Sequence, residues 1–414
     1  MATTTDSAPA RVLDVTRLIS RAGRGVTGVD RVERAYLAHF LRDETPFFAL
    51  ARTALGFVLL DRTGAGRLLT VSESDDWGRP DLLSRLSRRL DPARQAAQAT
   101  LRRLALARAP RGGLGRMLAR HMPAGTVYFN IGHSNLSTRV MEAVRTVRNA
   151  RIAVLIHDTI PLDFPDYQRP GTVETFRGRL AVAGQYADWI ITASEVVRAS
   201  LLHHLSACPP VVVAPLGVTP PRPDPTAIPP GIRLDRPYFV TLGTIEPRKN
   251  HALLLDVWER LGDDPPGLVI CGARGWQNEA VFARLDRGIP GVTEHSGVSD
   301  GAVAALLQGS RGLLFPSLAE GYGLPPIEAA ALGVSVICGD LAIYRETLGD
   351  LPVYLSVRDS YLWENTIRRM ATAPAPERPR PISPPGWQAH FNRALSPIGQ
   401  LRGTAQMRGP SHEG

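Results

Sequence analysis

The stretch from Phe315 to Asp340 constrains the fold more than any other part of the chain. Its two apolar runs, 312–316 and 334–338, are short, continuous and bounded by turn residues, which is typical of buried strands. Between them, Pro325-Pro326 indicates the start of a helix. A strand, a helix and a second strand predict a parallel sheet, and open α/β sheets bind their ligands at the carboxyl edge of the strands.

Two carboxylates lie in this stretch, eight positions apart. Glu320 falls in the loop at the predicted sheet edge, and Glu328 in the first turn of the predicted helix. Gly321 and Gly323 allow the backbone to approach a bound group, and the start of a helix offers free N–H groups to an anion. The arrangement suits a phosphorylated ligand whose hydroxyls are held by carboxylates.

The sequence Glu-Gly-Tyr-Gly-Leu-Pro-Pro-Ile-Glu-Ala, which begins at Glu320, resembles the paired-glutamate signature of the retaining glycosyltransferases of family 4. The resemblance implies that Glu320 contacts the donor sugar, that Glu328 contacts the nucleotide ribose, and that residues 321–324 complete the donor site: Gly321, Tyr322, Gly323 and Leu324. Ala330-Ala331 stands where the family often has Met-Ala, and Ser335 where it often has Pro. The fold implied is α/β of the GT-B type, with two Rossmann-like doubly wound domains facing a cleft and a C-terminal helix crossing back.

The chain has 48 basic residues, of which only Lys249 is a lysine. It follows Arg248, between a predicted strand at 238–242 and a predicted helix at 252–261. The forked guanidinium of an arginine beside the compact charge of a lysine is well suited to bind a diphosphate. An exposed basic turn without a ligand is the alternative interpretation of the same residues. The segment resembles the family's phosphate-binding motif, which implies that Arg248 and Lys249 hold the donor pyrophosphate. Gly243 and Gly272 end their predicted strands and are expected to line the nucleotide cleft.

A His-Asp pair, His157-Asp158, follows the predicted strand 151–156 directly. The carboxyl end of a parallel strand is where an α/β enzyme places its chemistry. A capping Asp beside a structural His is the alternative. The sequence His-Asp-Thr-Ile-Pro-Leu resembles the family's first domain and implies that His157 lies beside the reacting sugar. His133 follows the strand predicted at 126–131, so we assign His133 and Asp158 to the acceptor side of the cleft.

A glycine-rich segment, Gly23 to Gly28, has the spacing GxGxxG. A dinucleotide site would also need an acidic residue at the end of the second strand, which here ends at Ala51-Arg52. An NADP-dependent oxidoreductase therefore remains an alternative, but the acidic residue that its dinucleotide site would need is missing from the expected position. Residues 27–32 instead resemble the first loop of a subgroup of family 4, which places Thr27, Gly28 and Arg31 near the donor diphosphate and the acceptor. A solvated arginine is the other interpretation of Arg31.

The net charge of +9 is concentrated in one segment. Between Arg79 and His121 there are eleven Arg and two Asp, so this segment alone carries 11 − 2 = +9. Its leucines recur at near-helical spacing, which predicts a basic helical insertion. It could lie on an anionic membrane surface or pack on the first domain. No aromatic residue interleaves the arginines and no recognition motif is present, so nucleic acid is not an expected partner.

A chain of 414 residues is too long to fold around one hydrophobic core of ordinary size, so we expect two domains. We expect a first domain at 1–217, a Pro-rich linker at 218–237, a nucleotide-sugar domain at 238–380, a return helix at 381–396 and a disordered tail at 397–414. Apolar runs between Gly56 and Val71 are read as short strands.

Three features bear on location and cofactors. The first ten residues lack a signal-peptide pattern, and no stretch approaches the roughly 18 apolar residues of a transmembrane helix. The three cysteines are far apart and are read as reduced core thiols. These features indicate a cytoplasmic protein, or one peripheral on the inner face of the cytoplasmic membrane. No Asp-x-Asp sequence occurs, so no obligatory metal or other cofactor is expected.

The expected function is transfer of a hexose, with retention, from a nucleotide sugar to a hydroxyl of a lipid-linked or growing surface glycan. The loop at 27–32 and the His-Asp element resemble mannosyl- and rhamnosyl-transferases of surface polysaccharide assembly, which favours GDP-mannose over a UDP- or dTDP-sugar. His157, Glu320, Arg248 and Lys249 are the expected catalytic residues, and no enzymic nucleophile is assigned. A sugar phosphorylase or epimerase and a catalytically silent membrane scaffold remain as alternatives.

Overall fold

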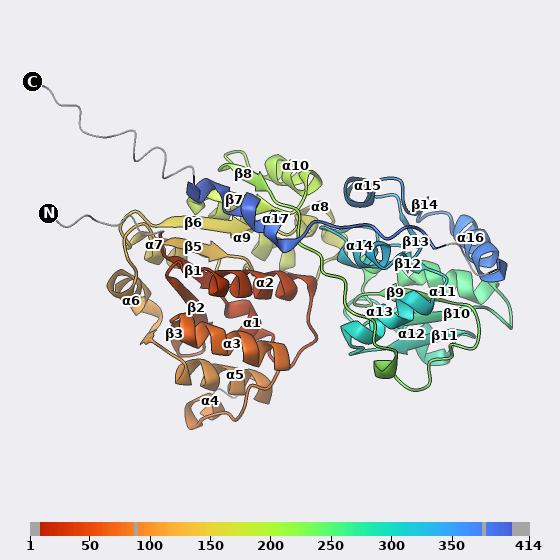
Figure 1. Ribbon diagram of the computed structural model, residues 1–414, viewed down its shortest axis with the longest axis horizontal. Helices are drawn as coiled ribbons and strands as arrows, with labels where there is room; N and C mark the ends of the chain where they lie inside the picture. The colour runs from red at the N-terminus through yellow and green to blue at the C-terminus, as the bar shows by residue number, and fades with distance from the viewer. Residues whose placement is uncertain (1–8, 87–89, 375–377, 400–414) are drawn as a thin grey trace, which may run out of the picture.

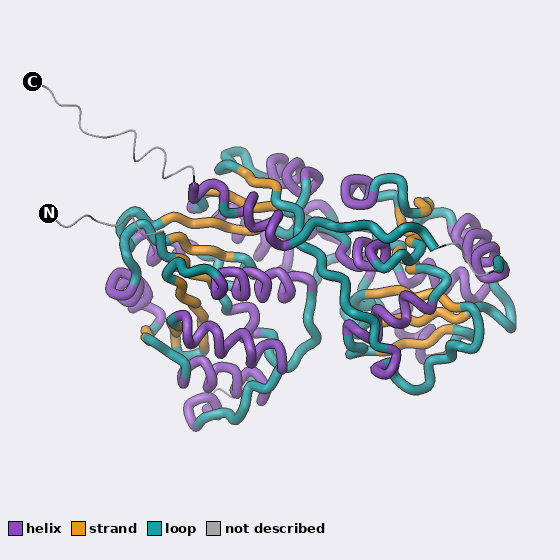
Figure 2. The backbone as a smooth tube through the Cα atoms, viewed as in Figure 1, coloured by secondary structure: helices purple, strands orange, loops and turns teal. Residues whose placement is uncertain are grey.

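The computed structural model describes residues 9–86, 90–374 and 378–399, and these form two α/β domains side by side (Figure 1). Each domain has a central sheet with helices on both faces (Figure 2). The predicted fold class, two doubly wound domains, is therefore confirmed. The tail predicted at 397–414 lies mostly outside the described residues.

The first domain contains an eight-stranded sheet in the order β4-β3-β2-β1-β5-β6-β7-β8. Strand β3 runs antiparallel to β2, and β4 antiparallel to β3, whereas the pairs from β2 to β8 are parallel. The strands are β1 (Arg11–Asp14), β2 (Phe47–Thr53), β3 (Gly56–Leu60), β4 (Ala107–Ala109), β5 (Val127–Asn130), β6 (Arg151–Leu155), β7 (Trp189–Thr192) and β8 (Val211–Val213). The parallel strands are almost wholly apolar because helices cover both faces.

Ten α-helices are described in this domain: α1 (Thr16–Ser20), α2 (Gly28–Arg42), α3 (Arg62–Ser74), α4 (Leu82–Leu86), α5 (Pro92–Arg103), α6 (Leu114–His121), α7 (Thr138–Arg145), α8 (Ile160–Asp163), α9 (Thr172–Tyr186) and α10 (Glu195–His204). Helix α2 turns Val32, Tyr36 and Phe40 into the core, as their helical spacing predicts.

The second domain contains a parallel six-stranded sheet in the order β11-β10-β9-β12-β13-β14. Its strands are β9 (Tyr238–Leu242), β10 (Gly267–Cys271), β11 (Val292–His295), β12 (Leu313–Phe315), β13 (Val336–Gly339) and β14 (Val353–Leu355). Its helices are α11 (His251–Arg260), α12 (Glu279–Arg287), α13 (Asp300–Gly309), α14 (Leu324–Ala331), α15 (Ala342–Leu348) and α16 (Ser360–Thr372). The strand order reverses between β9 and β12, so ligands are expected beyond the ends of these two strands.

The last helix, α17 (Trp387–Ala394), packs against the first domain (Figure 1). His390 is fully buried there: its Nδ1 faces the Ala214 carbonyl at 3.0 Å, and its Nε2 lies 2.9 Å from the Tyr36 hydroxyl. Because a carbonyl only accepts, Nδ1 carries the proton and the Tyr36 hydroxyl donates to Nε2. The predicted crossing back of the C-terminal helix is thus confirmed.

Two local predictions were wrong. Of the short strands expected between Gly56 and Val71, only β3 is present; residues 62–71 belong to α3, because the Asp61 carboxylate accepts from the Gly64 N–H at 2.8 Å and caps the helix. Glu328 is the fifth residue of α14, one turn later than predicted, because the helix already begins at Leu324.

The segment 79–121 differs from a simple helical insertion. It supplies β4, which pairs with β3 in the sheet, and the Leu101 side chain of α5 is fully buried. Some of its arginines also have internal partners: Arg102 is 5% exposed and its Nε donates to the Asp81 carboxylate at 3.0 Å. The segment is therefore built into the first domain.

Candidate functional site

The second domain presents two loops at the carboxyl edge of its sheet. After β9, Gly243 (φ +122°) leads into the 3-10 turn Pro247–Lys249, and after β12 residues 316–323 lead into α14. The Leu318 N–H donates to the Arg248 carbonyl at 2.8 Å and joins the two loops. A Cβ on Gly272 would lie 1.9 Å from the Gly243 carbonyl oxygen, so both predicted cleft glycines are needed for this close approach.

Arg248, Lys249 and Glu320 form one buried cluster. Arg248 Nη1 lies 3.0 Å from Glu320 Oε1, and Lys249 Nζ donates to the same carboxylate oxygen. Arg248 Nη2 donates to Glu246 at 2.6 Å. Burial alone would favour the neutral acid, but the charges of Lys249 and Arg248 hold the pKa of Glu320 below its ordinary value. The residues predicted to bind the diphosphate, Arg248 and Lys249, thus contact Glu320, the residue predicted to bind the sugar.

Glu328 pairs across the two domains. Its Oε1 accepts from Arg31 Nη1 of α2 at 2.6 Å, while Arg31 Nη2 donates to Asp300 at 2.6 Å. Burial raises the pKa of Glu328, against the opposing charge of Arg31. A small cavity of about 110 Å³ lies beside this pair, lined by both residues and by Leu324, among others.

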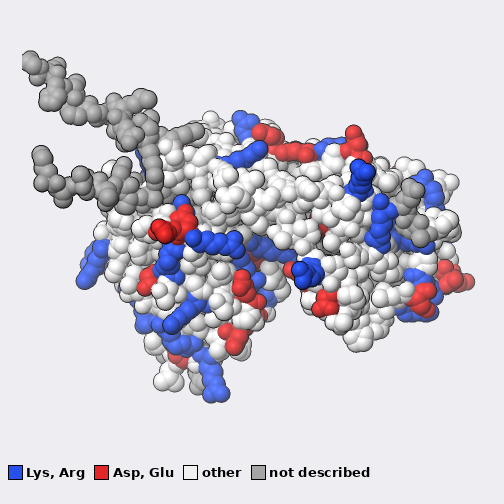
Figure 3. All heavy atoms as spheres, viewed as in Figure 1, with Lys and Arg blue, Asp and Glu red and all other residues white. Residues whose placement is uncertain are grey.

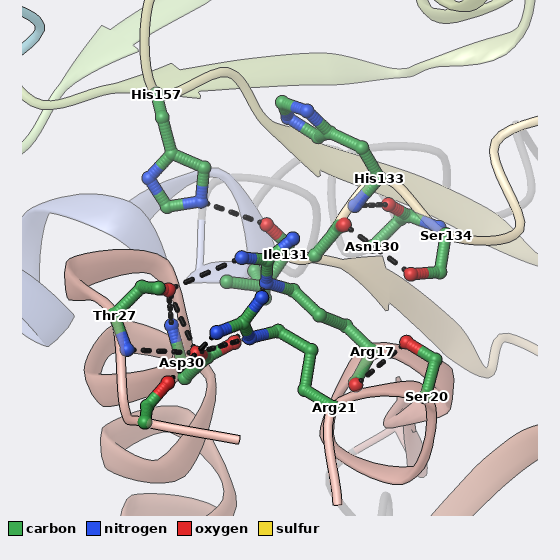
Figure 4. Close-up of polar contacts among 12 residues, drawn as sticks. Arg17, Ser20, Arg21, Thr27, Asp30, Asn130, Ile131, His133, Ser134 and His157 are labelled. Atoms are coloured by element: carbon green, nitrogen blue, oxygen red, sulfur yellow. Dashed lines mark hydrogen bonds and ion pairs between the residues drawn. The ribbon is translucent and has the colours of Figure 1, made fainter. Parts of the chain in front are cut away.

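The strand-end histidines of the first domain lie together (Figure 4). His157 Nε2 lies 2.9 Å from the Ile131 carbonyl, His133 Nε2 lies 2.7 Å from the Leu155 carbonyl, and the ring centroids are 5.5 Å apart. Because carbonyls only accept, each Nε2 carries the proton and each Nδ1 is left as an acceptor. Burial lowers the pKa of His157 to about 3 and that of His133 to about 4, so both rings are neutral near pH 7.

The two halves of the predicted site face one another. A Cβ added at Gly321 would lie 2.9 Å from both the Asp158 Cβ and the His157 carbonyl oxygen, so the second domain's glycine loop contacts the first domain's His-Asp element. Burial raises the pKa of Asp158, opposed by the Arg248 charge. Beside His157 a cavity of about 590 Å³ opens on the first-domain side. This volume suits a small-molecule ligand.

Thr27 and Tyr322 have structural partners. Thr27 caps α2: its hydroxyl donates to Asp30 at 2.7 Å, and Asp30 also binds Arg17 and Arg21 (Figure 4). Tyr322 is 7% exposed and its hydroxyl donates to the Leu216 carbonyl at 3.3 Å. Both side chains hold the cleft's walls in place.

Gly28 and Leu324 meet across the cleft, since a Cβ on Gly28 would lie 3.3 Å from the Leu324 Cδ1. Gly23 to Gly28 follows α1 and does not join β1 directly to a helix. A dinucleotide fingerprint needs that direct junction, so the structure gives the oxidoreductase alternative no support.

Sequence reasoning missed three participants. Glu246 and Asp300 partner Arg248 and Arg31, but only folding shows which cation each carboxylate faces. Arg179 lines the 590 Å³ cavity from α9. The sequence did contain a sign that Arg179 belongs to this wall. Thr172, Thr175 and Phe176 precede it by seven, four and three residues, which places all four on one face of the helix.

The two domains and the cleft between them define a GT-B protein. Residues 227–368 match the family described as glycosyl transferases group 1.

The chain is 31% identical over 229 residues to the serotype-specific mannosyltransferase WbdA of Escherichia coli, an alignment covering 49% of this chain and 27% of WbdA. It is 34% identical over 118 residues to the O-antigen chain mannosyltransferase B of Escherichia coli, covering 27% of this chain and 31% of that protein. The chain therefore spans about a quarter to a third of the length of these curated relatives.

Among solved structures, Anabaena HepE in complex with UDP and glucose superposes with a TM-score of 0.59 at 14% identity, covering 96% of this chain and all of that chain (100%). The sucrose-phosphate synthase of Thermosynechococcus elongatus gives 0.56 at 16% identity, covering 97% and 98%. These likenesses establish the fold.

Proposed function

We propose that the protein is a retaining glycosyltransferase that moves a hexose, with mannose favoured, from a nucleoside-diphosphate sugar to a hydroxyl of a lipid-linked or growing surface glycan. The observation that carries the proposal is the buried Arg248–Lys249–Glu320 cluster facing His157 and Asp158 across the cleft. The family match and the similarity to mannosyltransferases support a hexose transfer and favour GDP-mannose, with UDP- and dTDP-sugars as the other candidates.

The proposed mechanism uses charge stabilisation. Arg248 and Lys249 hold the donor diphosphate and stabilise the negative charge that develops as the sugar leaves. Glu320 turns from these cations to the sugar hydroxyls, and Glu328 holds the ribose. His157, neutral with a free Nδ1 acceptor, accepts a hydrogen bond from a hydroxyl of the sugar or the acceptor. The acceptor hydroxyl adds to the anomeric carbon, its proton passes to the leaving phosphate, and the bond from that carbon to the phosphate oxygen breaks.

Donor binding is tested by thermal stabilisation with a panel of nucleoside diphosphates and nucleotide sugars. We expect nucleotides of one base to raise the thermal midpoint of the wild type and of Glu279→Ala, but not that of Glu328→Ala. Glu279 is the matched control, because it is an exposed glutamate in the first turn of α12 in the same domain. Equal shifts in all three proteins would place the nucleotide elsewhere. A shift with NADP alone would replace the proposal with an oxidoreductase.

Chemistry is tested separately with Arg248→Ala and Lys249→Ala. Each is expected to lower turnover at saturating donor by about 100-fold, which is the usual effect of removing one preorganised donor to a developing anion. Wild-type turnover in both variants would exclude the proposed role of the diphosphate grip. Product analysis at the anomeric carbon tests retention.

We also propose that the first domain binds the inner face of the membrane peripherally through the segment 79–121. The segment exposes Leu82 (79%), Leu83 (49%) and Leu106 (44%) near arginines, and basic and acidic side chains are mixed on its visible face (Figure 3). In the described residues no helix is long and apolar enough to cross a membrane. Sedimentation with phosphatidylglycerol vesicles should be lost in Leu82→Glu/Leu83→Glu and kept in Leu202→Glu, whose leucine is exposed on α10. Equal sedimentation of both variants would overturn this assignment.

A further inference from the structure

The 590 Å³ cavity beside His157 has a basic wall that the proposed donor chemistry does not use. The cavity lies on the first-domain side of the cleft and is lined by Arg17 of α1, by His133 and by the first half of α9, among others. Arg248 and Lys249, the proposed diphosphate grip, are absent from its lining. Under the proposed function, this is the side that the acceptor occupies.

Helix α9 turns one face toward this cavity. Thr172, Thr175, Phe176 and Arg179 all line it. Gly171, which precedes the helix without a capping side chain, lines it as well. Apolar groups from Val29 and Phe176 complete the wall. The cavity therefore combines an apolar surface suited to a sugar ring with the cationic side chains of Arg17 and Arg179.

Among the residues that the structure describes, Arg179 has no partner for its charge. It is half-buried, and within the described ranges no hydrogen bond or ion pair joins it to another residue. Burial, with the nearby charges of Arg52 and Arg17, lowers the pKa of Arg179. A half-buried guanidinium that faces other cations is stabilised by any anion that enters the cavity.

The acidic groups nearby do not cancel this charge. Asp30 lies 2.8 Å from Arg17 and 2.9 Å from Arg21, so one carboxylate serves two arginines. Asp158 lines the cavity and Glu33 lies beneath Gly132. Burial raises the pKa of both carboxyl groups, and the Arg248 charge opposes that rise at Asp158. The two histidines are neutral, as described above. The lining therefore contains two arginines, Arg17 and Arg179, and one carboxylate, Asp158.

Building on the proposed function, we propose that this cavity binds an oxyanion carried by the acceptor, a phosphate or a carboxylate, with Arg179 as its main ligand and Arg17 beside it. The acceptor is then an anionic glycan or glycolipid, held so that its hydroxyl reaches the sugar beside His157. The planar guanidinium forms paired, charge-assisted hydrogen bonds with either kind of oxyanion, whereas a neutral acceptor offers no opposite charge.

The test is calorimetric titration with three probes at constant ionic strength: inorganic phosphate, D-glucuronate and uncharged D-glucose. It is carried out on protein with Lys249→Ala, which weakens the donor phosphate grip, and on the same protein with Arg179→Ala or Arg177→Ala added. Arg177 is the matched control, because it is exposed on the same helix and does not line the cavity. Removing one charge-assisted hydrogen-bonding partner is expected to weaken anion binding about tenfold or more.

We expect phosphate or glucuronate to bind, to lose that affinity in Arg179→Ala, to keep it in Arg177→Ala and to regain part of it in Arg179→Lys. The tighter of the two anions identifies the acceptor's charged group. Equal affinities in the Arg177 and Arg179 variants, or binding of neither anion, would overturn the inference. The thermal midpoint of each variant without ligand checks folding, and Arg179→Lys provides the test if Arg179→Ala unfolds.

The nucleotide panel separates this inference from the proposed function. If no nucleotide stabilises the protein while Arg179-dependent anion binding persists, the transferase proposal fails and the anion site stands. If a nucleotide binds and the anion titration fails, the donor site stands and the anionic acceptor is excluded.

Discussion

At the scale of single residues, Glu320 is the most consequential side chain, because one of its oxygens forms ion pairs with two largely buried cations, Arg248 and Lys249. Replacing it by Gln leaves Lys249 buried without a counter-charge. We expect Glu320→Gln to lower the free energy of unfolding by about 3 kcal/mol, as breaking a buried ion pair usually does. Urea denaturation measures this loss.

The control for Glu320 is Glu195→Gln, which removes a glutamate from an exposed pair with Arg198 and should change stability little. The double variant Lys249→Met/Glu320→Gln should recover most of the loss, because no buried charge is then left alone. A double variant as unstable as Glu320→Gln would contradict the ion-pair explanation.

The buried histidines predict how stability depends on pH. The pKa of His157 is lowered to about 3 in the folded protein, against an ordinary value near 6.5. Between these values the unfolded chain binds more protons than the folded one, so the free energy of unfolding falls as pH drops from about 6.5 toward about 3 and is level above that window. His133 adds to the same slope.

Denaturation at several pH values should show a shallower slope in His157→Asn than in the wild type. His203→Asn, which removes an exposed histidine of α10, should leave the slope unchanged. An identical slope in His157→Asn would mean that the imidazole is not held neutral by burial.

At the scale of elements, α17 fixes the chain's return to the first domain. Phe391 is 3% exposed and stacks on His39 with ring centroids 3.7 Å apart. We expect Phe391→Ala to destabilise the protein by about 3–5 kcal/mol, the usual cost of removing a buried aromatic side chain. Gln388→Ala, on the exposed face of the same helix, is the control. Equal denaturation midpoints for the two variants would show that α17 does not contribute to the core.

Substituting two glycines by alanine distinguishes the effect of helix propensity on stability from the effect of close backbone packing. Gly178 lies in α9 with no heavy atom within 4 Å of an added Cβ, so Gly178→Ala should stabilise the protein by about 1 kcal/mol. Gly272→Ala must instead separate the loops after β9 and β10, because its Cβ would overlap the Gly243 carbonyl. Thermal midpoints should move in opposite directions; a rise for both would contradict the close approach at Gly272.

Elements with a strong apolar pattern were predictable. The strands β5, β6 and β9 were expected within a few residues, because buried parallel strands leave continuous apolar runs. The helix α11 was expected within one residue at each end. The helix α3 was missed because its two glycines disfavour a helix and its apolar runs are short. The Asp61 cap and packing on α2 decide the outcome. The site's sequence motifs predicted which residues matter. They could not predict that Glu320 binds Lys249, since that contact joins residues 71 positions apart.

At the scale of the whole molecule, the domains share one hydrophobic cluster that includes Leu216, Tyr322 and Ile327. Polar contacts supplement it: Glu346 accepts from the Glu195 N–H at 2.7 Å, and Trp276 Nε1 donates to the Tyr167 carbonyl at 3.4 Å. The Arg31–Glu328 ion pair belongs to the same interface.

Arg31 and a bound nucleotide compete for Glu328, if the carboxylate holds the ribose as proposed. Arg31 Nη1 donates to Glu328 Oε1 at 2.6 Å, so the ribose hydroxyls must displace the guanidinium before they bind. Removing Arg31 removes that competition, and we expect Arg31→Ala to raise the affinity for the stabilising nucleoside diphosphate about tenfold, or about 1.4 kcal/mol. Calorimetric titration measures the affinity. Arg42→Ala, exposed at the end of α2, is the control and should bind as the wild type does. A lower affinity in Arg31→Ala would instead mean that Arg31 turns from Glu328 to the diphosphate, which the glycine-loop resemblance also allows.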